Sequence, residues 1–272
     1  MMRLHYQKYS PTGNVTVLVT TPVSRDVQRE IAARLLGPGG VGGEQAGFIE
    51  PAADPRCAAR LQMMGGEFCG NATMSLGAML ARKASLADGG AMDLLLEVSG
   101  SATPVPCHIE RDGDGWIGTV RMPLPTRVGK IALETDAGPL AVPLVELPGI
   151  AHLLIPAGAG LDEVELRRRL PLWNETVGAE AIGALRWDAD AAFMDPLVYV
   201  PSAGTLVREH GCGSGTAAVG CFLALAAGRD VDLPVRQPGG AIRVAAKPGD
   251  GVVTDLSITG RVTLVEEDAI SL

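Results

Sequence analysis

Two cysteines each stand between a glycine-containing loop and an apolar run, an arrangement that could transfer protons. Cys69 lies in GGEFCGNATMSLGAMLA, residues 65–81, and Cys212 lies in EHGCGSGTAAVGCFLALA, residues 209–226. A helix N-terminus presents unpaired N–H groups and a partial positive charge, which favour a thiolate. We therefore expect both thiols to lose a proton more readily than a free cysteine does.

Two such thiols could act as a pair on one carbon atom. One thiolate would remove a proton from a carbon beside a carboxylate, and the other thiol would return a proton to the opposite face. Free N–H groups after each cysteine could hold the carboxylate or the developing negative charge. The chemistry predicted from the pair is racemisation or epimerisation, and this geometry requires no cofactor.

The two stretches are copies of one pattern, 143 residues apart when they are aligned on their cysteines. A weaker echo downstream repeats at an offset of 140 residues. The matched positions are Cys69 with Cys212, Gly77 with Gly220 and, in the weaker echo, Gly100 with Gly240. Two echoes at about half the chain length indicate an internal duplication.

The elements that must position the cysteines are two buried helices and a set of short strands. The residues after each cysteine are apolar on nearly all sides, which is typical of a buried helix. Short β-branched segments bounded by Gly, Pro or Asp predict strands at residues 15–21, 46–51, 116–122, 196–201 and 253–265. Two further helices are expected, at 24–36 with Ser24 as N-cap and at 161–170.

These elements predict an α+β fold of two pseudo-symmetric halves, with short strands wrapped around a central apolar helix in each. The N-terminal half is expected at residues 1–123, to which a C-terminal strand at 262–272 returns. The C-terminal half is expected at 124–261. The linker is expected within 123–130, which is rich in proline and polar residues. The active site is expected in the cleft between the halves.

Composition limits the partners of the chain. Of its 272 residues, 47% are hydrophobic but only 4% are aromatic, so aliphatic side chains and Met must fill the core. The net charge of −8 argues against nucleic acid or an anionic membrane as partner. No signal-peptide pattern and no membrane-length apolar run is visible, so we expect a cytoplasmic protein with a small-molecule substrate.

The other cysteines and the histidines form no recognised metal or cofactor pattern. The five cysteines include no C-x-x-C spacing, and the four histidines are scattered. No lysine lies in a recognised phosphate-binding loop. We therefore expect neither a metal nor a cofactor. Cys57, Cys107 and Cys221 are interpreted as small buried side chains.

At these motifs the chain resembles the diaminopimelate epimerase superfamily, which includes cofactor-independent amino-acid racemases. The motifs stand here as Cys69-Gly70-Asn71-Ala72 and Cys212-Gly213-Ser214-Gly215. SPTGNVTVLV, from residue 10, resembles the family's glycine-asparagine loop, and GEQAGFIEP, from residue 43, resembles its glutamine-bearing strand. The resemblance covers the whole chain. It implies a barrel-like sheet around each central helix and a homodimer.

Departures from the family pattern bear on the substrate. Diaminopimelate epimerases carry a Glu-Arg pair about nine residues before the second cysteine, where this chain has Ala203 and Gly204. Three segments, EQ-GFIE, GGEFCGNATMS and QPGG, instead resemble the histidine racemases of staphylopine-type opine metallophore pathways. That resemblance implies inversion of the α-carbon of histidine from L to D.

The expected site has Cys69 and Cys212 as its two bases. The substrate-binding residues expected around them are Asn14, Glu44, Gln45, Gly70, Asn71, Glu209, Gly213 and Ser214. The amide side chains and the backbone N–H groups would hold the α-carboxylate and α-amino groups. Glu44 and Glu209 would recognise a hydrogen-bond-donating side chain such as imidazole, or would be solvated loop residues. Glu67 is interpreted as a helix-end charge, and His210 as a neighbour without a proton-transfer role.

Two other functions remain open from the sequence. The chain could act on another amino acid, including diaminopimelate with an unusual clamp. It could also be a non-catalytic binding protein of the same fold, although the presence of both cysteines counts against this.

Overall fold

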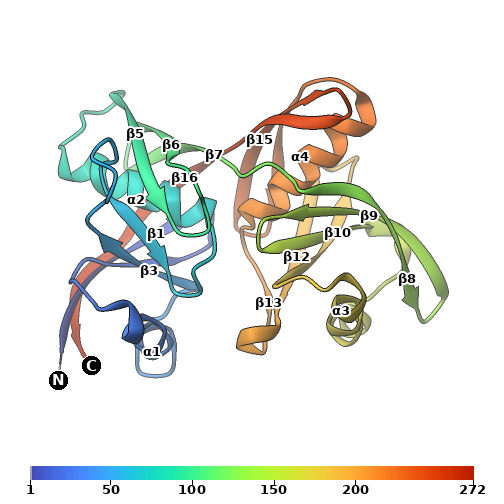
Figure 1. Cartoon of the computed structure of the whole chain (residues 1–272), viewed down its shortest axis with the longest axis horizontal. Helices are drawn as coiled ribbons and strands as arrows, with labels where there is room; N and C mark the ends of the chain where they lie inside the picture. Colours follow the sequence, from blue (N-terminus) through green and yellow to red (C-terminus); the bar gives the residue numbers. More distant parts are fainter. Residues whose placement is uncertain (1) are drawn as a thin grey trace. The chain divides into compact units, whose positions relative to one another are not determined.

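The structure, a computed structural model, describes residues 2–272. The chain divides into two compact units, Met1–Arg121 with Thr259–Leu272, and Met122–Ile258. Within the described residues each unit is built mainly of strands and has two α-helices (Figure 1). The predicted α+β class is confirmed at this level.

The first unit is a sheet whose strand order returns to its start. Its strands are β1 (Arg3–Pro11), β2 (Thr16–Val19), β3 (Gln45–Glu50), β4 (Arg60–Met63), β5 (Ala91–Val98), β6 (Val105–Asp112), β7 (Gly115–Arg121) and residues 259–271 of β16 (Val252–Ser271). Hydrogen bonds connect them in the order β1-β2-β3-β4-β5-β6-β7-β16, and β16 pairs again with β1.

Helix α2 (Gly70–Lys83), which follows Cys69, lies among these strands (Figure 1). It contacts β1, β2, β4, β5, β6 and β7, and all but one of the residues from Gly70 to Ala81 are buried. The predicted buried helix is therefore confirmed. Helix α1 (Arg25–Leu36) buries only one side, including Ile31 and Leu35. Ser24 is its N-cap as predicted, but the hydroxyl bonds Asp26 rather than the backbone.

The second unit carries the other buried helix. Its strands are β8 (Arg127–Thr135), β9 (Gly138–Leu147), β10 (Ile150–Pro156), β11 (Ile182–Asp188), β12 (Phe193–Val200), β13 (Thr205–Arg208), β14 (Val231–Gln237), β15 (Gly240–Gly249) and residues 252–258 of β16. Hydrogen bonds connect them in the order β8-β9-β10-β11-β12-β14-β15-β16, and β13 pairs with β12. Helix α4 (Gly213–Ala227), which follows Cys212, contacts β9, β10, β14 and β15.

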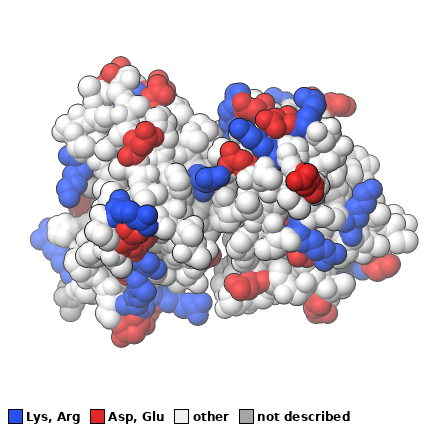
Figure 2. Space-filling model, turned by 45° about the horizontal axis from the view of Figure 1, so that its top comes forward, with Lys and Arg blue, Asp and Glu red and all other residues white. Residues whose placement is uncertain are grey.

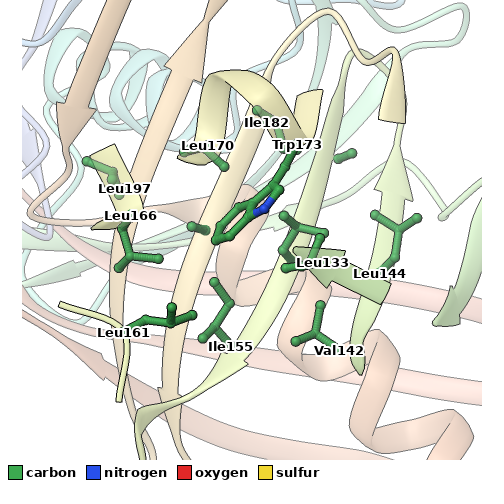
Figure 3. Packing of buried hydrophobic residues seen from close by; sticks show 13 residues of the cluster. Leu133, Val142, Leu144, Ile155, Leu161, Leu166, Leu170, Trp173, Ile182 and Leu197 are labelled. Atoms are coloured by element: carbon green, nitrogen blue, oxygen red, sulfur yellow. The ribbon is translucent and has the colours of Figure 1, made fainter. Parts of the chain in front are cut away.

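Helix α3 (Glu163–Val177) covers strands β8, β11 and β12 of this unit and is longer than predicted. The sequence predicts a helix over 161–170, and the observed helix continues through Pro171, although proline removes a helical hydrogen bond. The helix continues because Trp173, one turn further on, packs into the core with Leu133 and Ile155 (Figure 3). The indole N–H donates to the Glu134 carbonyl at 3.0 Å, so its polar group is satisfied.

A short loop connects β7 with β8. The loop before β8 is shorter than the expected linker, because β8 already begins at Arg127.

On the face shown in Figure 2, acidic and basic side chains are interspersed. Exposed ion pairs of the described residues include Arg127–Glu146, Arg82–Glu267 and Arg243–Asp232. In the described part of the chain, no helix is long and apolar enough to span a membrane.

Candidate active site

Both cysteines cap a buried helix, as the sequence predicts. Cys69 is the N-cap of α2 and Cys212 is the N-cap of α4. Each sulfur accepts a hydrogen bond from the backbone N–H three residues later, Ala72 and Gly215, in both cases at 3.4 Å. The repeated sequence therefore produces a repeated local geometry, with each Sγ held against the first turn of its helix.

A second matched contact fixes each cysteine's carbonyl. The pairs are Thr73 Oγ1 with Cys69 O at 2.7 Å and Thr216 Oγ1 with Cys212 O at 2.8 Å. Both threonine side chains are fully buried. The threonine of the repeat is thus a structural residue that orients the first turn of each helix.

In the first unit a chain of hydrogen bonds leads from Cys69 to Glu44. The Cys69 thiol donates to Gln45 Oε1 at 3.1 Å. Gln45 Nε2 donates to Asn14 Oδ1 at 2.6 Å and to Thr16 Oγ1 at 2.8 Å. Asn14 Nδ2 donates to Glu44 Oε2 at 2.7 Å. The structure thus brings three predicted site residues into one hydrogen-bonded chain with Cys69.

The turn after β1 and the start of β3 bring these side chains together. Gly13 has a φ of 82°, which allows the tight turn that places Asn14. The parallel pairing of β2 with β3 sets Thr16 opposite Gln45. Glu44 immediately precedes β3, and its backbone N–H donates to the Val15 carbonyl at 2.8 Å. The chain of side chains is therefore built on strand ends and not on an isolated loop.

In the second unit Cys212 is almost fully buried and lies beside a carboxylate. Its side chain hydrogen-bonds to Glu209, and its sulfur lies 3.5 Å from Ser214 Oγ. Burial raises the pKa of the Cys212 thiol well above its ordinary value, and the negative charge of Glu209 adds to this. The expectation of an easily ionised thiol is therefore wrong for Cys212 in the free protein. The cost of burying the thiolate outweighs the favourable hydrogen bonds at the helix N-terminus.

Gln237, at the end of β14, holds Cys212 in place but was not predicted to be a site residue. Its Oε1 accepts the backbone N–H of Cys212 at 2.6 Å, and its Nε2 donates to Thr216 Oγ1 at 2.8 Å. Gln237 is only 4% exposed. In the sequence, the QPGG segment shows only a resemblance to known racemases, and nothing local connects this glutamine with Cys212.

His152, on β10, is a second residue that the sequence did not assign. Its ring is fully buried, and its Nε2 lies 3.0 Å from Ser214 Oγ. It packs against Gly183 on the parallel strand β11, where a Cβ would lie 2.3 Å from the ring. Burial lowers the pKa of His152 to about 3. The imidazole is therefore neutral at ordinary pH and supports Ser214.

The other predicted residues lie near Cys69 or near Cys212. Gly70 and Asn71 are buried in the first turn of α2, and Gly213 in that of α4. The carbonyl of His210 accepts the N–H of Gly239 at 2.7 Å. Glu67 hydrogen-bonds to backbone N–H groups of its own loop, and burial raises the pKa of its carboxyl.

The three remaining cysteines are buried, as expected. Burial raises the pKa of Cys107 and of Cys221 to about 12. Across residues 2–272, no three His, Cys, Asp or Glu side chains lie together as a metal site would require.

Comparison with known proteins identifies the family. A family model described as the histidine racemase CntK N-terminal domain matches residues 3–270. The chain belongs to this family. A histidine racemase from Staphylococcus aureus (strain Mu50) is 32% identical over 268 residues, which cover 96% of this chain and 95% of that protein. A histidine racemase from Fusobacterium nucleatum (strain ATCC 25586) is 27% identical over 226 residues, which cover 81% of this chain and 80% of that protein.

A solved structure supports the same fold. A hydroxyproline epimerase from Agrobacterium vitis superposes with a TM-score of 0.73 at 16% identity, and the match covers 99% of this chain and 93% of that chain. The predicted resemblance to racemases and epimerases is confirmed, and the family places the chain among isomerases of this kind.

Proposed function

We propose that this protein inverts the α-carbon of histidine from L to D, with Cys69 and Cys212 as the two acid/base thiols. We infer histidine as the substrate because the chain resembles histidine racemases over nearly its whole length. One structural observation supports the mechanism most directly. Each cysteine caps a buried helix, with its sulfur accepting an N–H of the first turn.

The proposed proton transfers return Cys69, Cys212 and Glu209 to the protonation states in which they began. Cys212 passes its thiol proton to the Glu209 carboxylate, and the resulting thiolate removes the α-proton of the amino acid. Burial is the main cause of the raised pKa of Cys212, and the negative charge of Glu209 adds to it. The transfer removes this second contribution, because it leaves a neutral carboxylic acid beside the thiolate. The carbanion then takes the proton of the Cys69 thiol on its opposite face. The proton held by Glu209 returns through water to the Cys69 thiolate.

The remaining predicted residues would hold the substrate. Backbone N–H groups of Gly70, Gly213 and Ser214 lie in the first turns of the two helices, where N–H groups can point at a bound anion. Such groups stabilise a carboxylate and the negative charge that develops on it. Asn14, Gln45 and the side chain of Asn71 would complete the contacts to the α-carboxylate and α-amino groups. Glu44 and Glu209 would accept hydrogen bonds from the imidazole.

The wider setting belongs to the same proposal. In the first unit, the strand order that returns to β1 and the contacts of α2 with six strands support a barrel-like sheet around a central helix. A homodimer that serves metallophore biosynthesis is what the family resemblance implies, and a cytoplasmic location is what the sequence pattern leads us to expect.

Incubation with L-histidine in D₂O, without added pyridoxal phosphate, tests the proposal. Deuterium at Cα and the appearance of D-histidine are expected together. The variants Cys69→Ala and Cys212→Ala should each lose inversion, whereas Cys57→Ala, at a loop position, should keep it. Deuteration without inversion would contradict the second base. If the reduced protein gives neither signal, histidine is not the substrate, and a panel of amino acids beginning with diaminopimelate would follow.

A further inference from the structure

The chain of hydrogen bonds that ends at Cys69 has a direction set at its far end. We propose that Glu44 is a positioning residue, which acts through the amides of Asn14 and Gln45 to keep Cys69 as a thiol in the free enzyme. Cys69 would then begin as the proton donor and Cys212 as the thiol that is deprotonated. This inference rests on the proposed function, in which both cysteines transfer protons.

The direction begins at Glu44 because a carboxylate can only accept hydrogen bonds. It receives Asn14 Nδ2 at 2.7 Å, which fixes the amide so that Oδ1 points the other way. Asn14 Oδ1 in turn receives Gln45 Nε2 at 2.6 Å. The Gln45 amide must therefore present its oxygen to Cys69, and this oxygen takes the thiol proton at 3.1 Å.

Thr16 is compatible with this direction but does not impose it. Its hydroxyl accepts from Gln45 Nε2 at 2.8 Å and donates to the Asn14 carbonyl at 3.4 Å. A hydroxyl can both donate and accept, so it could equally donate to a reversed amide. Compared with Thr16, it is the Glu44 carboxylate, acting through Asn14, that forbids the reversed arrangement.

Burial makes the direction costly to reverse. Asn14 is 5% exposed and Thr16 is fully buried, whereas Glu44 and Gln45 are half-buried, so a mismatch at Asn14 is the one that bulk water relieves least. A buried polar group that faces a like partner loses a hydrogen bond and is not rehydrated. An amide reversed against the Glu44 carboxylate would place two acceptors together.

The two thiols therefore face acceptors of different chemistry. Cys69 donates to an amide oxygen, which is far too weak a base to take the proton away. Cys212 hydrogen-bonds to the carboxylate of Glu209, which can take it. The cysteine motif is duplicated, but the two acceptors are not. The acceptor for Cys69 is Gln45, on β3, whereas the acceptor for Cys212 is Glu209, three residues before it. The duplication thus gives two similar thiols with different starting roles.

Three variants, studied in the free protein without amino acid, test the inference. Glu44→Gln supplies an amide that can donate, so the Asn14 and Gln45 amides can turn and donate to a Cys69 thiolate. Asn14→Ala interrupts the chain but keeps the Glu44 carboxylate. Glu44→Asp keeps an acceptor at the end of the chain and should restore it. The readout is the rate at which iodoacetamide modifies Cys69, followed by mass spectrometry of its peptide from pH 6 to 10.

A fixed direction predicts that Glu44→Gln and Asn14→Ala both speed the modification near pH 7, by about tenfold for one hydrogen bond to a thiolate, and move the profile to lower pH. Glu44→Asp should behave as the unaltered protein. Faster modification in Glu44→Gln but not in Asn14→Ala would show that only the charge of Glu44 acts. An unchanged rate in both variants would show that Glu44 is not coupled to Cys69. Each of these two results would overturn the inference. Cys107 should stay unmodified throughout, which excludes local unfolding as the cause. Because no substrate is used, the result is independent of whether histidine is racemised.

Discussion

The buried imidazole of His152 lies with its Nε2 3.0 Å from Ser214 Oγ, and Ser214 lies 3.5 Å from the sulfur of Cys212. Gly183 makes this position possible, since any side chain there would collide with the ring. Because burial lowers the pKa of His152 to about 3, the ring stays neutral near pH 7. It orients Ser214 and is not expected to exchange protons during turnover.

This burial predicts that His152 makes folding sensitive to acid. The unfolded histidine titrates near its ordinary pKa of 6.5, and the folded one only near 3. Between these values the unfolded state binds more protons, so the free energy of unfolding falls as the pH falls. The uptake of one proton by the unfolded state lowers the free energy of unfolding by about 2 kcal/mol between pH 6.5 and 5. Urea unfolding at several pH values should show this slope, and His152→Gln should reduce it.

A second histidine provides the control for that experiment. His108 is exposed on β6, where its Nδ1 pairs with Asp93. His108→Gln should leave most of the acid sensitivity in place. An equal slope in the unaltered protein and in His152→Gln would contradict the assignment of the acid sensitivity to His152.

Gln237 is predicted to matter for both stability and activity. Gln237→Leu removes the acceptor of the buried Cys212 N–H and the partner of Thr216 Oγ1. A buried N–H left unpaired costs about 1–3 kcal/mol. The N-cap of α4 should loosen, so kcat for racemisation should fall by about tenfold or more. Gln7→Leu, on β1 at a less buried position, is the matched control. Unchanged kcat in Gln237→Leu would mean that Cys212 is positioned without it.

The five cysteines should differ in reactivity in the native protein. Burial raises the pKa of Cys107 and of Cys221 to about 12, so almost no thiolate is present at pH 8. Cys69 is less buried and should be modified by iodoacetamide at least about tenfold faster than either. Peptide mass spectrometry over time gives the order. Early modification of Cys107 or Cys221 would show that α2 or α4 opens readily.

The duplicated motif was the part of the sequence from which most could be predicted. Apolar residues on nearly all sides of residues 72–81 and 216–226 predict buried helices, and Cys69 and Cys212 are found at the N-caps of these helices. The matched glycines Gly100 and Gly240 adjoin turns between antiparallel strands, with φ of 73° and 141°. These features depend on local pattern and turn chemistry, which a sequence displays directly.

Several strands were not predicted because their patterns are mixed. Strand β1 (Arg3–Pro11) alternates buried Leu4 and Tyr6 with charged or polar residues, and it is held by pairing with the far end of the chain. The exposed edge strand β8 (Arg127–Thr135) fell partly within the expected linker for the same reason. Such strands are defined by their distant partners more than by their own composition.

The supporting residues of the site could not be predicted because they are distant in sequence. His152 reaches Ser214 across 62 residues, and Gln237 reaches Cys212 across 25. The direction of the Cys212 pKa shift was wrong for a related reason. A helix N-terminus is visible in a sequence, whereas the burial that outweighs it depends on the packed fold.

The matched glycines in the middle of the two buried helices make a last prediction. A Cβ on Gly220 would lie 2.4 Å from Val244 Cγ2 on β15, and one on Gly77 would lie 2.6 Å from Ile109 Cδ1 on β6. Gly220→Ala should therefore destabilise the fold by about 1–3 kcal/mol through overpacking, despite the better helix propensity of alanine. Urea unfolding measures the change.

The double variant Gly220→Ala with Val244→Ala decides whether that contact is the cause. Val244→Ala alone should also destabilise, because it leaves a cavity. Together the two changes should cost less than the sum of the single effects, since the new methyl group occupies the space that valine vacates. Gly158→Ala is the control, because a Cβ there meets nothing within 4 Å. Additive single effects would contradict direct packing of α4 on β15 as the reason for glycine at position 220.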